Sequence, residues 1–271
     1  MSHSSPSLPS LTVAIATMAA RLTPETLDAF PMKEGVEYLL ILQSPDAGPL
    51  SPDTRSMLDV LSLRDDVRCS VQLETKGVTK SRNLAIDLTE TELLLFCDDD
   101  IEPNIEGVDE LRSLFAQWPS VAFLCGRLKT TDGRDRKTYR TDQRQRVHRL
   151  NSLRVGTPEL AVRIADVRRH GPRFHTDFGA GAENFIGDEA LFIRDMLNAG
   201  LLGYHVAVTL GAHPPVSSGS NYTRSGLAVR LALFKELFGI WAPVFRLAFA
   251  LKNRARIGDA KAIIRFSLGK P

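Results

Sequence analysis

Short apolar runs rich in β-branched residues alternate along this chain with stretches in which apolar residues recur at helical spacing. The runs predict strands at residues 11–17, 36–43, 67–73, 93–97 and 121–124. Between them, Thr23-Pro24 and Ser51-Pro52 are typical of a helix N-cap followed by proline, and residues 79–88 predict a third helix. Strands that alternate with helices predict an α/β fold, with a mainly parallel, Rossmann-like sheet flanked by helices on both faces.

The pattern changes in the second half of the chain. Residues 127–154 are polar and carry ten Arg and Lys residues, which predicts a basic, mobile insertion. A helix is expected at 187–199, ended by Gly200, and a further strand at 204–210. We therefore expect a flexible amino terminus (1–10), one main domain (11–222) and a helical, basic carboxyl-terminal segment (223–271).

Composition narrows the function only slightly. Lys and Arg total 34 against 32 for Asp and Glu, so the overall charge indicates no acidic partner. The basic insertion has only Tyr139 as an interleaved aromatic and no nucleic-acid motif, so no nucleic acid is expected as a partner. Cys69, Cys97 and Cys125 lack the spacing of a zinc site and are interpreted as reduced core residues. No secretory signal is visible, which predicts a cytoplasmic location.

Three acids follow a predicted buried strand directly. Asp98, Asp99 and Asp100 stand at the carboxyl end of the 93–97 run, where ligands gather in parallel sheets. Alternate side chains share a face in extended backbone, so Asp98 and Asp100 can converge while Asp99 points away. Two converging carboxylates favour Mg²⁺ or Mn²⁺, which also coordinate a diphosphate. The alternative is a solvated acidic turn, with Asp100 or Asn104 capping the next helix.

Two further segments carry candidate chemistry. Residues 77–83 lead into a helix that Thr79 or Ser81 can cap, and Lys80 and Arg82 are candidates to contact nucleotide phosphates or base; an ordinary solvated first turn is the alternative. A Gly-rich turn at 178–183 then precedes Asp188-Glu189.

The acids at 188 and 189 open the predicted helix, where acids are commonly structural because they favour the positive end of the helix dipole. In a cleft, however, such a carboxylate can take a proton from an acceptor hydroxyl. Glu189 is the first candidate for this base and Asp188 the second. His213 follows the 204–210 strand and is a candidate nitrogen ligand for the metal, or simply a structural histidine.

Together these residues resemble the family 2 glycosyltransferases, which are inverting enzymes of the GT-A fold. The matching pieces are Val13 to Thr17 with Arg21, Lys80 to Asn83, Phe96 to Asp100, and Phe178 to Glu189. The segment 178–218, with its His213-Pro214, is most similar to members that build bacterial surface polysaccharides.

The resemblance implies a metal-dependent transfer of a sugar from a nucleotide-sugar donor to a hydroxyl of a glycan or lipid-linked acceptor. It assigns Asp98 and Asp100 to the family's DxD motif, which contacts ribose and metal, and it assigns Asp188-Glu189 to the family's catalytic Glu-Asp pair in inverted order. The expected donor contacts are Thr17, Arg21, Gln43, Lys80, Arg82, Asp98 and Asp99; the expected metal ligands are Asp98, Asp100 and His213. Gln43 stands where many relatives place an acid that reads uracil.

Two other functions remain open from the sequence. A sugar-nucleotide-forming nucleotidyltransferase shares a similar sheet, although the turn after the first strand, 17–21, lacks the expected glycines. A non-catalytic, membrane-associated scaffold is the second.

The carboxyl-terminal segment is basic and carries many apolar residues, but charges interrupt every run that could span a membrane. It predicts either a helical cap on the main domain or peripheral contact with an anionic membrane surface.

Overall fold

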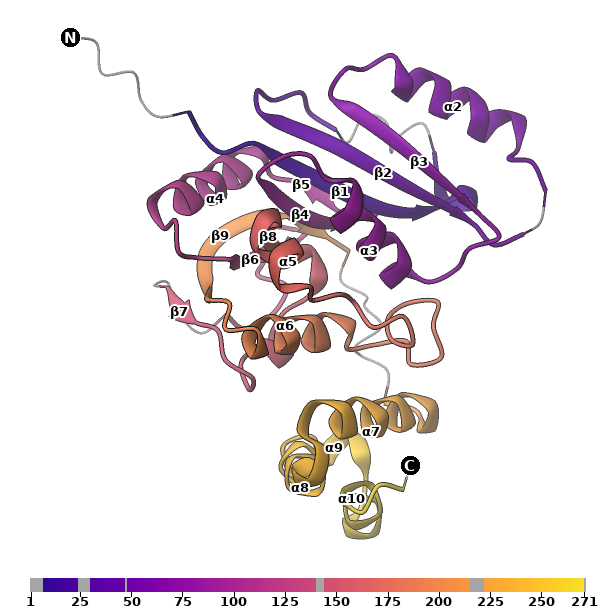
Figure 1. The fold of residues 1–271 in the computed structure, drawn as a ribbon. Helices are drawn as coiled ribbons and strands as arrows, with labels where there is room; N and C mark the ends of the chain where they lie inside the picture. Colours follow the sequence, from indigo (N-terminus) through magenta and orange to yellow (C-terminus); the bar gives the residue numbers. More distant parts are fainter. Residues whose placement is uncertain (1–6, 24–29, 47, 140–143, 215–221, 271) are drawn as a thin grey trace.

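The computed structural model describes residues 7–23, 30–46, 48–139, 144–214 and 222–270. Within them the chain forms a nine-stranded sheet with helices on both faces, and a group of helices at the carboxyl end (Figure 1). The expected helix after Thr23-Pro24 lies outside the described residues.

The strands and helices follow closely the apolar pattern of the sequence. The strands are β1 (Leu11–Met18), β2 (Val36–Ser44), β3 (Val67–Leu73), β4 (Leu93–Asp98), β5 (Glu102–Pro103), β6 (Phe123–Thr130), β7 (Gln145–Arg146), β8 (Leu160–Arg163) and β9 (Gly203–His213). The helices are α2 (Pro52–Ser62), α3 (Val78–Leu88), α4 (Ile105–Gln117), α5 (Ile164–His170), α6 (Asp188–Asn198), α7 (Arg224–Phe238), α8 (Ala242–Lys252), α9 (Arg254–Ile257) and α10 (Ala260–Ser267).

The sheet is mixed: its long pairings are parallel, as expected, and short antiparallel pairings join them. Its order is β3-β2-β1-β4-β8-β6-β9-β5, and the first four strands are parallel. β8 then pairs antiparallel with both β4 and β6, whereas β6 and β9 are parallel. The parallel half brings the carboxyl ends of β1, β2 and β4 to one edge, and this edge carries the predicted acids.

Two cores lie on the two faces of the sheet because side chains alternate along each strand. In β1, Val13 and Ile15 face a core that contains residues of α2 and α4, such as Leu61 and Leu111. Ala14 faces the opposite core, which contains residues of α3, α5 and α6. The central strands are therefore buried on both faces, as their uninterrupted apolar runs predict.

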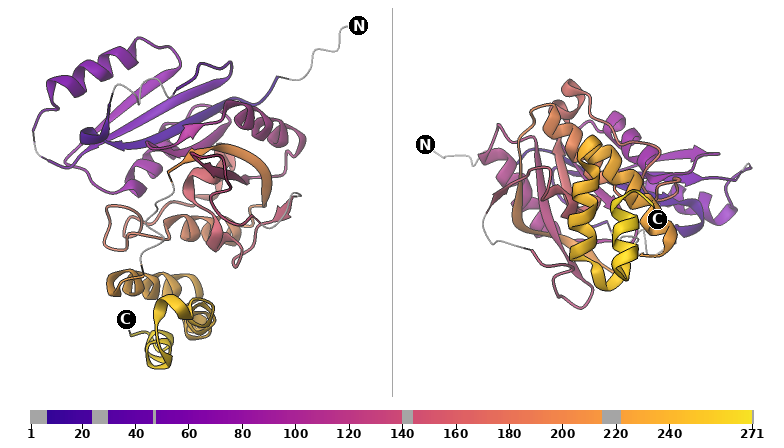
Figure 2. Two further views of the ribbon diagram at one scale, coloured as in Figure 1. Left: turned by 180° about the vertical axis from the view of Figure 1, so that it is seen from behind. Right: turned by 90° about the horizontal axis from the view of Figure 1, so that it is seen from below.

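The carboxyl-terminal helices form a unit attached to the main domain through α6. Leu233 and Leu237 of α7 pack with Leu191 of α6. α8 and α10 lie beyond α7, on the side away from the sheet (Figures 1 and 2). Within the described part of the chain, no helix is long and apolar enough to span a bilayer.

The predicted basic insertion begins later than expected. β6 continues to Thr130, so the first residues of the 127–154 segment belong to the sheet. The described residues beyond it pack on the domain: Val147 is 1% exposed, and the Tyr139 hydroxyl lies 2.7 Å from Oε1 of Glu159. The expectation that all three cysteines are core residues also needs correction. Cys69 is exposed on β3, whereas Cys97 and Cys125 are buried.

Candidate functional site

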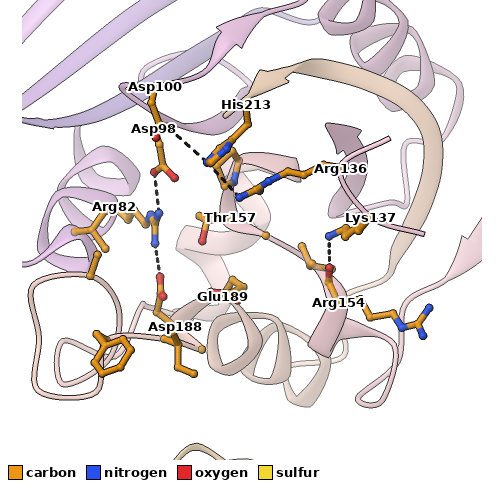
Figure 3. Close-up of a pocket in the computed structure, with 18 of the residues that line it drawn as sticks. Arg82, Asp98, Asp100, Arg136, Lys137, Arg154, Thr157, Asp188, Glu189 and His213 are labelled. Atoms are coloured by element: carbon orange, nitrogen blue, oxygen red, sulfur yellow. Dashed lines mark hydrogen bonds and ion pairs between the residues drawn. The ribbon is translucent and has the colours of Figure 1, made fainter. Parts of the chain in front are cut away.

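Two adjoining cavities open at the carboxyl edge of the parallel strands. The larger, the central cavity, has a volume of about 520 Å³. It is lined by Asp98 and Asp100 from the tip of β4, by Asp188 and Glu189 from the start of α6, and by His213 from the end of β9. Residues far apart in the sequence thus meet around one hollow, as the predicted site requires (Figure 3).

The smaller, the strand-tip cavity, has a volume of about 320 Å³ and lies over the ends of β1 and β2. Thr17, Gln43 and Asp99 line it but do not line the central cavity. Arg21, Arg82, Asp98 and Asp100 line both cavities, so the two cavities lie side by side. All expected donor contacts except Lys80 therefore border this joint space.

Asp99 is held on the strand-tip side. Its carboxylate accepts a hydrogen bond from the Thr17 hydroxyl at 2.6 Å and pairs with Nη2 of Arg21 at 2.6 Å. Burial raises the pKa of the Asp99 carboxyl, and the neighbouring Asp100 and Asp98 add to this, while Thr17 and Arg21 oppose it. These two contacts therefore compensate a carboxylate that stands beside two others.

Arg82 joins the two acidic segments. Its guanidinium donates to Asp188 on one side, and its Nη2 lies 3.0 Å from Oδ1 of Asp98 on the other (Figure 3). Only 8% of the Arg82 side chain is exposed. Burial alone would lower the pKa of this guanidinium, but Asp188, Asp98 and Glu189 outweigh it and raise the pKa. Arg82 therefore stays charged and fixes the tip of β4 relative to the start of α6.

Asp188 and Glu189 are neighbours with different surroundings. Asp188 is 4% exposed and its carboxylate is committed to Arg82. Burial of the Glu189 carboxyl raises its pKa, and the adjacent Asp188 charge raises it further, whereas Arg82 partly offsets both. A carboxylate with a raised pKa binds a proton more readily, so Glu189 has the properties of a general base.

Asp100 faces His213 across the central cavity. Nε2 of His213 lies 3.7 Å from Oδ1 of Asp100 and 3.2 Å from Nη2 of Arg136. Nδ1 of His213 bonds the carbonyl of Pro214; since a carbonyl only accepts, Nδ1 carries the proton. In the neutral ring the lone pair of Nε2 then accepts from Arg136. An imidazole whose other nitrogen donates to a carbonyl has the orientation of a metal-binding histidine, so a cation can take the place of the Arg136 contact.

The acidic segment is more than a helix-capping turn. Asn104 caps α4 by accepting a hydrogen bond from the backbone N–H of Gly107 at 3.3 Å. Asp100 therefore has no capping role and faces the cavity instead.

The Gly-rich turn at 178–183 closes one side of both cavities. Gly179 and Gly181 have φ values of +93° and +86°, which favour glycine. A Cβ on Gly179 would lie 3.0 Å from Oδ1 of Asp188, and one on Gly181 would lie 3.1 Å from Cα of Gly77. These glycines let the turn pack against Asp188 and the start of α3, and they present Ala180 to both cavities.

The start of α3 differs from the prediction. The helix begins at Val78 with Gly77 as its N-cap and no side-chain cap, so neither Thr79 nor Ser81 caps it. Lys80 is exposed and lines neither cavity, because side chains two positions apart on a helix point about 200° away from each other and Arg82 faces inward. Lys76, just before the helix, lines the strand-tip cavity in its place.

Several lining residues were not candidates from the sequence. Arg136, Lys137 and Arg154 of the basic segment and Thr157 line the central cavity (Figure 3). The only sequence signal for them was the density of basic residues at 127–154.

Gln43 is 3% exposed, and its side-chain amide donates to the carbonyl of Gly77 at 3.1 Å, which ties the end of β2 to the start of α3.

The residues that could hold a divalent cation are Asp100 and His213. Among the described residues, no group of three or more His, Cys, Asp and Glu side chains is arranged to hold a metal ion. Asp98, the third expected ligand, is engaged by Arg82. A carboxylate oxygen and an imidazole nitrogen suit Mn²⁺, with the remaining ligands supplied by a diphosphate or water.

The fold and the placement of these acids define a GT-A type structure, which confirms the expected fold class. The described chain resembles solved structures of TarS from S. aureus. Residues 1–349 of TarS in complex with UDP-GlcNAc match with a TM-score of 0.58 and 15% identity, over 85% of this chain and 67% of that one. The same TarS piece without ligand matches with a TM-score of 0.57 and 15% identity, over 95% and 81%.

A longer TarS structure and a UDP complex extend this comparison. The longer chain matches with a TM-score of 0.54 and 16% identity over 83% of this chain, but only 40% of its own length is covered. The UDP complex matches with a TM-score of 0.54 and 17% identity, over 83% of this chain and 65% of that one. No protein-family model and no curated protein match the sequence. At these identities the likeness establishes the fold.

The raised pKa of the Glu189 carboxyl predicts how the free energy of unfolding changes with pH. A carboxyl whose folded pKa lies above its unfolded value stabilises the fold fully below the unfolded pKa of about 4.3, and this contribution is lost as pH rises through the folded pKa. The Glu189→Gln variant has no titrating carboxyl at this position, so it does not lose stability in this way as pH rises. The free energy of unfolding of the variant relative to wild type should therefore increase from pH 5 to pH 9, measured by chemical denaturation.

Glu183→Gln, at an exposed position of the preceding turn, is the matched control. An equal difference between Glu189→Gln and wild type at both pH values would show that Glu189 does not carry the raised pKa.

Proposed function

We propose that this protein is an inverting glycosyltransferase that moves a sugar from a nucleotide-sugar donor to a hydroxyl group of a glycan or lipid-linked acceptor. The observation that carries the proposal is the shared central cavity, in which Asp100 and His213 face Asp188 and Glu189. Transfer to a hydroxyl needs positive charge for the leaving diphosphate and a base for the acceptor, and this cavity brings both within one hollow.

The strand-tip cavity is the proposed site of the nucleoside. It has polar groups at one end, including Thr17, Arg21 and Asp99. The Ser81 hydroxyl, which belongs to a lining residue, is buried and has no hydrogen-bond partner among the described residues, so a ligand can supply one. That TarS structures of the same fold contain UDP-GlcNAc and UDP supports a nucleotide sugar as the donor.

A divalent cation, Mn²⁺ or Mg²⁺, is proposed at Asp100 and His213, next to Asp98. When bound, it supplies positive charge that stabilises the departing nucleoside diphosphate. Arg136, 3.2 Å from Nε2 of His213, adds a fixed positive charge on the same side of the cavity. Arg82 and Arg21 line the passage between the two cavities and favour the diphosphate there.

Glu189 is the proposed base. It takes the proton of the acceptor hydroxyl while that oxygen bonds to the anomeric carbon and the bond from this carbon to the diphosphate oxygen breaks. Attack from the side opposite the leaving group inverts the anomeric centre. Asp188 positions Arg82 and is a poorer base because its carboxylate already accepts from that guanidinium. Holding donor and acceptor together also lowers the entropic part of the barrier.

The rival functions make different products. A nucleotidyltransferase would release pyrophosphate from a nucleoside triphosphate, and a scaffold would turn over neither substrate. Release of nucleoside diphosphate from a nucleotide sugar, with Mn²⁺ present, separates the three. Thermal-shift screening against UDP-, GDP- and dTDP-sugars identifies the donor to use.

The metal site gives the first activity prediction. Asp100→Ala should abolish turnover and remove the Mn²⁺ dependence of nucleotide binding together, because the proposed cation loses its carboxylate ligand. Turnover is measured as nucleoside diphosphate release, and binding by calorimetry with and without Mn²⁺. Glu106→Ala, an exposed acid in the first turn of α4, is the control. Unchanged turnover in Asp100→Ala would remove this residue from the site.

The base gives the second activity prediction. Glu189→Gln should leave nucleotide binding close to that of the wild type and lower the transfer rate on the order of a hundredfold or more, because the amide cannot take the proton. Asp188→Asn should instead affect binding and stability, since it leaves Arg82 with one carboxylate fewer. A pure rate loss in Asp188→Asn, with full activity in Glu189→Gln, would reverse the assignment.

The carboxyl-terminal helices support a proposal of peripheral membrane contact. Ile240, Val244, Leu247 and Leu251 are exposed at helical spacing along one side of α8 and the turn before it. From residue 239 to 270 the sequence has seven Arg and Lys residues and one acid, Asp259. An apolar stripe among basic side chains fits an anionic lipid surface.

Vesicle binding tests this contact. Leu251→Glu should reduce co-sedimentation with vesicles of anionic lipid about tenfold, because it removes apolar burial and adds a repelled charge. Leu63→Glu is the control, since Leu63 is 82% exposed at the far end of α2. Wild-type protein that fails to bind anionic vesicles would refute the proposal.

A further inference from the structure

A third cavity lies beside the central one, between the end of the sheet and the basic segment. This basic cavity has a volume of about 350 Å³ and is lined by β6 and β9 residues such as Cys125 and His205. Arg127, Lys137 and Arg154 line it from the main domain, and Lys252 lines it from the end of α8. The carboxyl-terminal unit therefore completes the wall of this cavity.

Positive charge prevails in the basic cavity. Among the described residues that line it, four cationic side chains accompany one carboxylate, that of Glu159. The Glu159 side chain is 2% exposed and is already bound by Nζ of Lys137 at 2.5 Å and by the hydroxyl of Tyr139 at 2.7 Å. Glu159 therefore compensates Lys137, and the described lining offers no second carboxylate to Arg154 or Lys252.

The positive charges around this cavity also act on His205. Burial, together with the positive charges of Lys137, His148 and Arg154, lowers its pKa to about 4. Its Nε2 is buried and has no hydrogen-bond partner in the described part of the chain. A neutral imidazole can donate this bond to a bound anion without adding charge.

The position of the basic cavity relates it to the acceptor. It shares Lys137 and Arg154 with the central cavity, and it shares no residue with the strand-tip cavity. In Figure 3 these two residues lie on the side of the central cavity away from Arg82 and Asp98. The order is thus strand-tip cavity, central cavity, basic cavity, with the proposed nucleoside and the basic cavity at opposite ends.

We infer that the basic cavity binds an anionic group of the acceptor, a phosphate or a carboxylate, next to the hydroxyl that receives the sugar. This inference rests on the proposed function, because it assumes that the donor fills the other two cavities. Arg154 and Lys252 provide the charge, and the distance from the nucleoside end keeps this anion separate from the donor diphosphate.

The test measures binding of acceptor-like oligomers to protein saturated with Mn²⁺ and UDP. The probes are a neutral glucose oligomer, a galacturonate oligomer and a glycerol phosphate oligomer of equal length, together with a lipid-linked sugar diphosphate in detergent. At least one anionic probe should bind about tenfold or more tightly than the neutral one. The probe that binds best identifies the anion as a carboxylate, a chain phosphate or a lipid-linked diphosphate.

Two charge-reversal variants test whether the anionic probe binds in this cavity. Lys252→Glu should weaken the preferred anionic probe about tenfold, and Lys235→Glu, an exposed residue of α7 outside the cavity, should not. Equal binding of neutral and anionic probes, no binding of any anionic probe, or equal effects of the two substitutions would overturn the inference. Nucleotide binding measured in parallel separates the outcomes: if wild type binds none of UDP, GDP and dTDP in the presence of Mn²⁺, the proposed function itself fails.

Discussion

The site depends on the ion pairs that the buried guanidinium of Arg82 makes with two carboxylates. This guanidinium spans the carboxylates of Asp98 and Asp188, which come from the tip of β4 and the start of α6. Without a cation between them, the buried Asp188 and the partly exposed Asp98 would repel, and this would push the helix start away from the strand tip. Removing one partner of such a buried ion pair typically costs about 3–5 kcal/mol, because the remaining charge is left uncompensated. Arg82 thus sets the relative position of both halves of the site.

The acids of the site differ in function because their cationic neighbours differ. Asp99 is compensated by Arg21, Asp98 and Asp188 by Arg82, and Asp100 faces His213. In the part of the chain that the structure describes, no ion pair is dedicated to Glu189, and burial and the adjacent Asp188 raise the pKa of its carboxyl. A fold that tolerates one poorly compensated carboxylate in a cavity is less stable than it could be, and this is expected where a base must take up a proton.

Much of this arrangement could be predicted from the sequence because strong local patterns encode it. The apolar run ending at Cys97 placed the three aspartates at a strand tip, and Gly187 placed Asp188 and Glu189 at a helix start. What local pattern could not give was the antiparallel insertion of β8 between β4 and β6, since four residues carry little periodicity. For a related reason the sequence could not show that Lys80 lies outside both cavities: Lys80 and Arg82 are both basic residues at the start of one helix, and only the packing of α3 decides which one faces inward.

The central claim is that one hollow binds nucleoside, diphosphate and metal in a fixed order beside Glu189. The most direct measurement is a crystal structure of the protein with UDP and Mn²⁺, in which anomalous scattering locates the metal. The account predicts a manganese peak between Asp100 and His213, with uracil in the strand-tip cavity near Gln43. A nucleotide bound elsewhere, or a manganese peak remote from Asp100, would contradict it.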